Sequence, residues 1–273
     1  MIKTPITENF LQNALQTEVF GRGLVEIRER ISSTNIRAKK MALVGAGEGT
    51  LVVAESQTAG RGRLGRIWHS PPGLNIYFSL ILKPEIPPPR IPLLTLTAGL
   101  AGSSAIGSLI GQAPSVKWPN DLLLQNRKIA GILAEMDIKD SRVSFVILGI
   151  GINVNLAEQD LPPDLRNQAG SLLISTGKTW DRTEILASLL GELERYYRLL
   201  CQGRYDEILG QYRQVCQTLK TRVRFVQQET VIEGTAIDVG QSGELIVERA
   251  GDGEILYLNA GEVSSLPAEP EEP

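Results

Sequence analysis

The chain has 273 residues, 42% hydrophobic and 22% charged, a balance that excludes wholesale disorder and allows a sizeable core. Its 28 basic and 31 acidic side chains give a net charge of −3, which argues against a general nucleic-acid or anionic-membrane binder. Two cysteines and one histidine, His69, exclude a disulfide framework, a cysteine-based zinc site and multi-histidine metal sites, so we expect a reducing, cytoplasmic compartment.

The first half of the chain predicts a mixture of helices and strands, and its polar N-terminus does not resemble a signal peptide. Ser33 precedes a helix that ends near Gly45, and strands are expected at 50–54 and 74–82. The stretch 91–116 has no charged residue, but serines, threonines and glycines dilute its hydropathy. We therefore predict a buried helix starting near Pro92 and not a membrane span. Two strands, at 129–136 and 143–154, follow it.

The second half of the chain predicts two helices, followed by a region of short strands. Asp181 begins a helix with apolar positions continuing to Tyr197, and a second helix covers 205–216. From about Thr218, short alternating strands separated by glycines predict a small β-barrel. We expect an α+β body over residues 1–217, the β module over 218–266, and a disordered acidic, proline-rich tail over 267–273.

A loop rich in glycine and arginine, residues 60–66, carries the densest chemical signal. Its glycines satisfy the dinucleotide pattern G-x-G-x-x-G, but residues 67–72 contain two prolines and cannot open the required helix. Arg61, Arg63 and Arg66 between the glycines, closed by Trp68, favour a loop that binds an anion over a solvated turn.

A second motif, residues 117–121, combines the side chains that nucleotide-dependent acyl activation needs. Lys117 and Lys128 supply cations for phosphate and carboxylate, and Asn120 and Asp121 supply an amide and a carboxylate. Trp118 is expected to pack against a base or ring. The simpler alternative is a surface turn of the Pro-Asn-Asp type with ordinary lysines beside it.

A third element, residues 149–155, places asparagines at the end of a buried strand. A buried amide is costly unless it is hydrogen-bonded, so Asn153 indicates either a functional group or a strand that ends in a turn at Asn155.

These elements together resemble the biotin–protein ligases, also called biotin–[acetyl-CoA-carboxylase] ligases. Their order and spacing match across residues 30–156, and the run Gly261-Glu262-Val263-Ser264 is similar to the C-terminal module of that family. The resemblance implies a mixed-sheet catalytic domain of the biotin/lipoate ligase type followed by an SH3-like β-barrel. Two rival functions are a lipoate–protein ligase, which the loop and the Lys117 motif disfavour, and a non-enzymatic biotin sensor.

The resemblance also implies a reaction in two steps. Biotin and Mg-ATP give biotinyl-5′-AMP and pyrophosphate, and biotin then passes to a lysine of a biotin carboxyl carrier protein, a subunit of acetyl-CoA carboxylase. The substrates are ATP and biotin, with Mg²⁺ held by unknown ligands. The implied biotin-binding residues are Ser33, Thr34, Asn35, Gln57, Arg61, Gly62, Arg63, Lys128 and Gly131. The implied ATP-binding residues are Arg63, Arg66, Trp68, Lys117, Asn120, Asp121, Lys128 and Asn153.

Three of these residues are predicted to be catalytic. Lys128 would neutralise the repulsion between the biotin carboxylate and the α-phosphate, and Arg63 would belong to the loop that folds over the adenylate. A free lysine has a pKa of about 10.4, so near pH 7.4 only about one in 10³ is nucleophilic. Asp121 is expected to orient that amine and accept its proton. This chemistry needs no histidine, so His69 is expected to be a loop residue.

Two departures from the family qualify the resemblance. About 30 residues precede Ser33, which predicts a monofunctional member without the DNA-binding domain and therefore no specific DNA binding. Ser265-Leu266 stands where many relatives have an arginine that reaches the nucleotide, so the resemblance does not imply a nucleotide contact from the C-terminal module. The oligomeric state stays open, a homodimer included.

Overall fold

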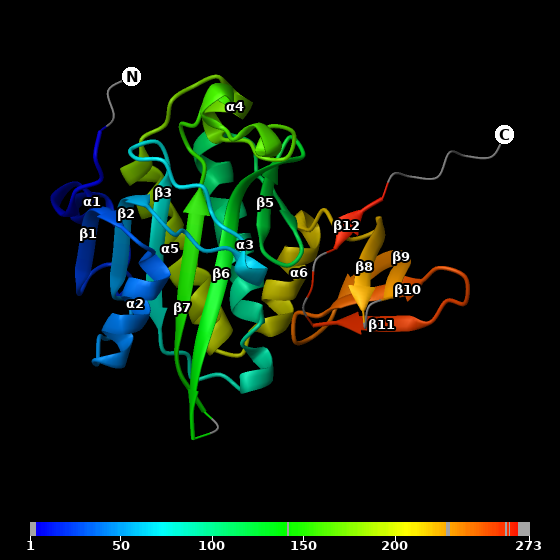
Figure 1. Cartoon of the computed structure of the whole chain (residues 1–273). Coiled ribbons are helices and arrows are strands. Elements are labelled where there is room, and N and C mark those ends of the chain that lie inside the picture. Colours follow the sequence, from blue (N-terminus) through cyan, green and yellow to red (C-terminus); the bar gives the residue numbers. More distant parts are fainter. Residues whose placement is uncertain (1–3, 141, 228–229, 260, 262, 267–273) are drawn as a thin grey trace.

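The structure, a computed structural model, describes residues 4–140, 142–227, 230–259, 261 and 263–266. It contains a seven-stranded mixed sheet flanked by helices and a separate five-stranded antiparallel sheet (Figure 1). The predicted α+β class, with a mixed-sheet body and a β module, is confirmed. The predicted disordered tail, 267–273, and Glu262 lie outside the described residues.

The large sheet has the strand order β1-β2-β3-β7-β6-β5-β4. β1 and β2 pair in parallel and the other neighbours are antiparallel. β3 is buried at all seven positions because helices cover both faces of the sheet. The strands are β1 (Val25–Ile31), β2 (Leu51–Gln57), β3 (Ile76–Leu82), β4 (Ser115–Lys117), β5 (Asp121–Leu124), β6 (Arg127–Lys139) and β7 (Arg142–Ile152).

One helix covers one face of this sheet. The longer helices α3 (Leu93–Ile110), α5 (Arg182–Cys201) and α6 (Tyr205–Val215) lie on the other side (Figure 1). α2 (Thr34–Leu43) packs Ala38 and Met41 on Ile81 and Ile147, whereas the neighbouring side chains of β3 and β7 turn toward α3 and α5. The remaining helices are α1 (Glu8–Ala14) and α4 (Leu172–Thr176), with 3₁₀ turns at Arg63–Gly65, Pro88–Arg90, Glu158–Asp160 and Pro163–Leu165.

α3 is the uncharged helix of the sequence, and it begins directly after Pro92 as predicted. By length and composition, residues 88–110 could cross a membrane, but 67% of that apolar window is buried inside the protein. Small residues let the helix approach the sheet: a Cβ at Gly102 would lie 2.6 Å from the Cδ1 of Leu122. The helix therefore serves as a core element of the α+β body.

The C-terminal sheet has the order β11-β10-β9-β8-β12 and packs beside α6 (Figure 1). A turn between its strands is anchored to the α+β body, since the indole N–H of Trp118 donates to the carbonyl of Gly243 at 3.0 Å. Trp118 is only 2% exposed, so its indole is a buried structural anchor, and the expectation that its ring packs against a base stays a prediction. The strands are β8 (Arg222–Gln227), β9 (Thr230–Val239), β10 (Leu245–Arg249), β11 (Ile255–Leu258) and β12 (Ser264–Ser265).

Candidate active site

A single cavity of about 540 Å³ brings together every site residue predicted from the sequence. It lies on the face of the sheet that carries α2, between the N-terminus of that helix and the loop 60–66, hereafter the arginine loop. The structure places these residues side by side, and their individual roles stay predictions. They are Ser33, Thr34, Asn35, Gln57, Arg61, Gly62, Arg63, Arg66, Trp68, Lys117, Asn120, Asp121, Lys128, Gly131 and Asn153.

Strand register explains why distant motifs share this cavity. Asp121 pairs with Gly131, which pairs with Gly151, so one cross-strand row runs from the second motif to the third. In the next row toward α2, Leu133 pairs with Gly149, which pairs with Ser79. Because alternate residues of a strand share a face, these residues all face the cavity side of the sheet.

Neutral hydrogen-bonding groups form the end of the cavity at α2. Gln57 Oε1 accepts from the Thr34 backbone N–H at 2.9 Å, and Ser79 Oγ donates to Asn35 Oδ1 at 2.6 Å. Ser33 takes the N-cap position as predicted, but its side chain makes no capping bond within the described part of the chain. Ser33 is one of the residues that line the cavity.

Glycines in β6 and β7 make the floor of the cavity. A Cβ at Gly149 would lie 1.9 Å from Asn35 Oδ1, and one at Gly151 would lie 2.5 Å from the Nε1 of Trp68. At Gly131 it would lie 2.9 Å from the Trp68 ring. The bare backbone therefore lets an amide and an indole rest directly on the sheet. Nε1 of Trp68 is buried and has no hydrogen-bond partner among the described residues.

The arginine loop folds back on itself over this floor. The N–H of Gly62 donates to the carbonyl of Arg66 at 2.8 Å, and the N–H of Trp68 donates to that of Gly60 at 2.9 Å. The loop does not open a helix of the dinucleotide-binding type, since only a three-residue 3₁₀ turn follows Gly62. Its glycines instead allow a compact turn that presents arginines to the cavity.

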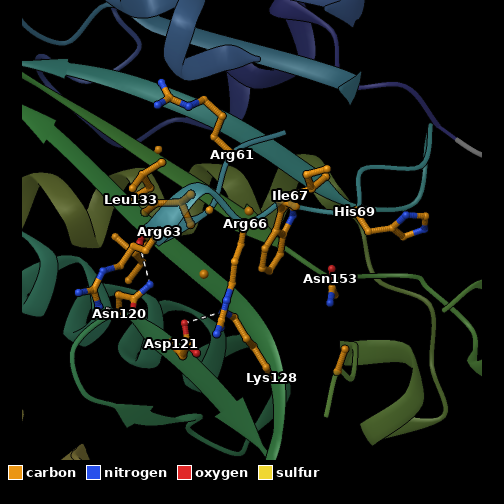
Figure 2. A pocket seen from close by; sticks show the side chains of 18 of the residues that line it. Arg61, Arg63, Arg66, Ile67, His69, Asn120, Asp121, Lys128, Leu133 and Asn153 are labelled. Atoms are coloured by element: carbon orange, nitrogen blue, oxygen red, sulfur yellow. Dashed lines mark hydrogen bonds and ion pairs between the residues drawn. The ribbon is translucent and has the colours of Figure 1, made fainter. Parts of the chain in front are cut away.

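Two arginines of the loop reach different partners. Arg63 Nη1 donates to Asn120 Oδ1 at 3.1 Å, and its Nη2 donates to the carbonyl of Gly261 at 3.3 Å. Arg61 Nη1 forms an ion pair with Glu135 Oε1 at 2.9 Å. Figure 2 shows Arg63 turned toward Asn120, whereas Arg61 points away from it. The loop is therefore held to the second motif, to the C-terminal module and to β6.

Lys128 and Asp121, two of the predicted catalytic residues, form an ion pair in the cavity (Figure 2). Nζ of Lys128 lies 2.7 Å from Oδ1 of Asp121 and 5.4 Å from the centre of the Trp68 ring. The side chains are 33% and 21% exposed, so incoming ligands can reach both. Asp121 is in β5 and Lys128 is in β6, and these two strands are neighbours in the sheet.

The electrostatics of the cavity differ from those of the whole chain. Among its lining residues there are five Lys and Arg side chains and one acidic side chain, although the chain has a net charge of −3. A partly enclosed site with this excess of fixed cations binds anions such as carboxylates and phosphates. Among the described residues, no three His, Cys, Asp or Glu side chains form a metal-binding group.

Asn153 is 6% exposed, and its side-chain amide is hydrogen-bonded. Nδ2 donates to the carbonyl of Gly170 at 2.9 Å, and Oδ1 accepts from Asn75 at 3.3 Å. The structure thus gives Asn153 a structural network as well as a place on the cavity wall. His69 is exposed on its loop and points away from the Lys128 and Asp121 pair (Figure 2).

Two walls of the cavity were not predicted from the sequence. One is the segment after β7, which has no sequence signal beyond scattered leucines. The other is the C-terminal module, whose backbone reaches the site even though Ser265-Leu266 stands in place of an arginine. The unpredicted residues in these walls are Leu156, Leu161, Leu165, Asn167, Gln168, Ala169, Gly261, Val263 and Ser264.

Comparisons with known proteins agree with this geometry. Residues 27–153 match the model of the biotin/lipoate A/B protein ligase family. The bifunctional ligase/repressor BirA of Bacillus subtilis is 38% identical over 250 residues, which cover 91% of this chain and 77% of that protein. The biotin–[acetyl-CoA-carboxylase] ligase of Mycobacterium tuberculosis is 32% identical over 271 residues, 97% of each chain. The chain belongs to the biotin/lipoate A/B protein ligase family.

A solved structure extends the match to the three-dimensional fold of this family. The biotin protein ligase of Aquifex aeolicus in complex with biotin and ATP is similar with a TM-score of 0.76 and 29% identity. The match covers 90% of this chain and all of that one. The resemblance inferred from the sequence motifs is therefore confirmed at the level of the family and the fold.

Proposed function

We propose that the protein is an ATP-dependent biotin–protein ligase, a biotin–[acetyl-CoA-carboxylase] ligase. The observation that carries the proposal is one cavity with a neutral polar end at Asn35 and Gln57 and a cationic end at Lys128 and Arg63. A neutral ureido group suits the first end, and the carboxylate and phosphates of an acyl-activation reaction suit the second. The family membership and the biotin and ATP bound to the Aquifex ligase support the same assignment.

In the first step, a carboxylate oxygen of biotin attacks the α-phosphorus of ATP. The new O–P bond gives biotinyl-5′-AMP, and the bond from the α-phosphorus to the bridging oxygen breaks to release pyrophosphate. The reactants are both anions, so Lys128 lowers the barrier by placing a cation between them. Arg63 and Arg66 supply further donors for the phosphates.

Mg²⁺ enters this proposal as part of the substrate Mg-ATP. The lining residues offer one carboxylate, Asp121, and the amide oxygens of Asn120 and Asn153. Mg²⁺ commonly keeps several waters and binds through substrate phosphates plus one or two carboxylates. The donor set therefore fits an ion delivered on ATP, which would neutralise phosphate charge during the attack.

In the second step, the neutral ε-amine of the carrier lysine attacks the acyl carbon of the adenylate. An amide bond forms, AMP leaves with the electrons of the cleaved anhydride bond, and the amine loses a proton. Asp121 is the carboxylate in reach of this end of the cavity, so we assign it to orient the amine and accept that proton. The acceptor is a biotin carboxyl carrier domain of acetyl-CoA carboxylase.

Both cysteines are free thiols, which supports a reducing, cytoplasmic setting.

Biotin-dependent exchange of labelled pyrophosphate into ATP tests the first step, and a mass increase of a carrier domain tests the second. We expect both with the wild-type protein. A protein that binds biotin without exchange is a sensor, and exchange driven by lipoate in place of biotin identifies a lipoate ligase. Either result overturns the proposal.

A further inference from the structure

Glu135, a residue of β6, makes two contacts that link separate parts of the site. Its Oε2 accepts a hydrogen bond from Asn35 Nδ2 at 2.8 Å, and its Oε1 forms the ion pair with Arg61 at 2.9 Å. One carboxylate thus joins the N-terminus of α2 to the arginine loop. Register places it on the cavity face of the sheet, next in alternation after Leu133.

The first contact fixes the orientation of the Asn35 side chain. Nδ2 faces the carboxylate of Glu135, and Oδ1 faces the Ser79 hydroxyl that donates to it at 2.6 Å. A flipped amide would set its oxygen against the carboxylate, two acceptors face to face. The second N–H and the second lone pair of Asn35 therefore present one defined pattern to a ligand in the cavity.

The second contact fixes the arginine loop. The Arg61 side chain is 47% exposed and that of Glu135 is 25% exposed, so the ion pair alone contributes little to global stability. Its consequence is local: it holds a loop whose other contacts at Arg63 lie on the far side of the cavity. Figure 2 shows Arg61 directed away from that side. Loss of the pair would release the attachment of the loop to β6.

We propose that Glu135 is a positioning residue that couples recognition at the polar end of the cavity to closure of the arginine loop. Glu135 does not line the cavity itself, and it acts through Asn35 and Arg61. The inference rests on the proposed function, because it assigns the polar end to biotin. A ligand seated against Asn35 stabilises the orientation that Glu135 selects, and the same carboxylate keeps Arg61 in place over the site.

Two substitutions separate the two contacts. Glu135→Gln is isosteric and keeps an oxygen that accepts from Asn35, but it removes the charge that holds Arg61. Glu135→Ala removes both contacts. Asp137→Asn is the control, since it neutralises an acidic residue two positions along the same strand. Thermal unfolding of each variant checks the fold, and the isosteric Gln variant keeps the test decisive if the Ala variant fails to fold.

Three readouts are taken on the full chain: the Kd for biotin without ATP, KM and kcat in pyrophosphate exchange, and the rate at which bound adenylate is released. We expect Glu135→Ala to raise the biotin Kd and KM about tenfold, with kcat and the KM for ATP nearly unchanged. Glu135→Gln should bind biotin nearly as wild type but release adenylate several-fold faster. Added salt should accelerate release from the wild-type protein more steeply than release from Glu135→Gln, which has already lost the Arg61 ion pair.

The inference is overturned if both Glu135 variants match Asp137→Asn in biotin Kd and in adenylate release. It is also overturned if the variants change kcat alone, because a positioning role acts on binding and retention. Failure of the proposed function looks different: the wild-type protein itself would then show no biotin-dependent exchange, whatever residue stands at position 135.

Discussion

Nζ of Lys128 lies 2.7 Å from Oδ1 of Asp121, so the two groups assigned to successive steps of the reaction are paired with each other. An ammonium group has three donors, and Lys128 can contact anionic substrates while it still holds Asp121. In the proposed reaction, the departure of pyrophosphate lets Lys128 share its charge with the adenylate phosphate, which would make Asp121 available to the acceptor amine. The pair would thus hold both groups at one point for the two proposed steps.

Replacement of Lys128 should damage the first step far more than the fold. Lys128→Ala leaves Asp121 without its cation and removes the charge that opposes repulsion between carboxylate and phosphate. We expect a loss of about 2–4 kcal/mol in transition-state stabilisation, measured as pyrophosphate exchange. Lys139→Ala, on an exposed position of the same strand, is the control and should stay close to wild type. Normal exchange in a folded Lys128→Ala protein contradicts the assignment.

Asp121→Asn should separate the two steps. The amide keeps the shape of the side chain but cannot accept a proton, so transfer to a carrier domain should slow by about 10²-fold. Pyrophosphate exchange should stay within a few-fold of wild type, because Lys128 is still present. Single-turnover transfer from preformed adenylate measures the second step alone. Equal losses in both steps would show that Asp121 acts only by holding Lys128.

Local signals in the sequence were sufficient for the long elements. Asp181 caps α5, and its Oδ1 accepts from the N–H groups of Thr183 and Glu184 as the spacing predicted. The edge strand β1 was not predicted: Val25, Ile27 and Ile31 stand at strand spacing, but four charged residues between them make the segment resemble a polar surface loop. Strand pairing and burial decide such a segment, and neither is readable from a short stretch of sequence.

The site was predictable where a residue is part of a dense motif and unpredictable where its role depends on register. Arg63 and Lys128 are in such motifs. Glu135 reads as an ordinary charged residue of an alternating strand, and only the fold sets it beside Asn35. Trp118 shows the same limit: its motif indicated a nucleotide site, and only the fold shows that its indole also anchors the C-terminal sheet. Sequence patterns identify chemistry, whereas tertiary contacts decide which side chain faces the ligand.

The glycine floor predicts an effect of a single methyl group. In Gly149→Ala the new Cβ would lie 1.9 Å from Asn35 Oδ1, so Asn35 must move away from Ser79. We expect about 1–3 kcal/mol lower stability and at least tenfold weaker biotin binding, measured by denaturation and calorimetry. Gly191→Ala is the matched control, since no described atom beyond its chain neighbours and the backbone of its own helix lies within 4 Å of the added Cβ. Unchanged biotin affinity in Gly149→Ala would contradict the assignment of Asn35.

Glu194 predicts how stability depends on acid. It is a buried carboxylate that accepts from the backbone N–H groups of residues 18–20 at 2.8–3.0 Å and contacts Arg198. Burial alone raises the pKa of Glu194, but these donors outweigh it and hold the pKa below its ordinary value of about 4.5. Its stabilisation is therefore complete above about pH 4.5 and is lost as pH falls through the lowered folded-state pKa.

Urea unfolding of Glu194→Gln against pH measures this contribution. At neutral pH we expect the variant to be about 1.5–3 kcal/mol less stable than wild type. That difference should shrink as the pH falls below 4.5, because the wild-type carboxylate becomes protonated. Glu192→Gln, at a partly exposed position on the same helix, should change stability much less at any pH. A difference that stays constant across this range would show that charge on Glu194 is not the cause.

The arginine loop is predicted to retain the intermediate after it forms. Biotinyl-AMP is a mixed anhydride that water destroys, so the enzyme needs a cover that stays closed between the two steps. Arg63 fastens the loop to Asn120 and to the carbonyl of Gly261. Arg63→Gly should still activate biotin but release the adenylate early, and the free adenylate would then acylate exposed lysines on unrelated proteins. Biotin labelling of a bystander protein, compared with wild type at equal adenylation rate, measures this escape. If the variant labels the bystander no more than wild type does, the arginine loop binds substrate without acting as a cover.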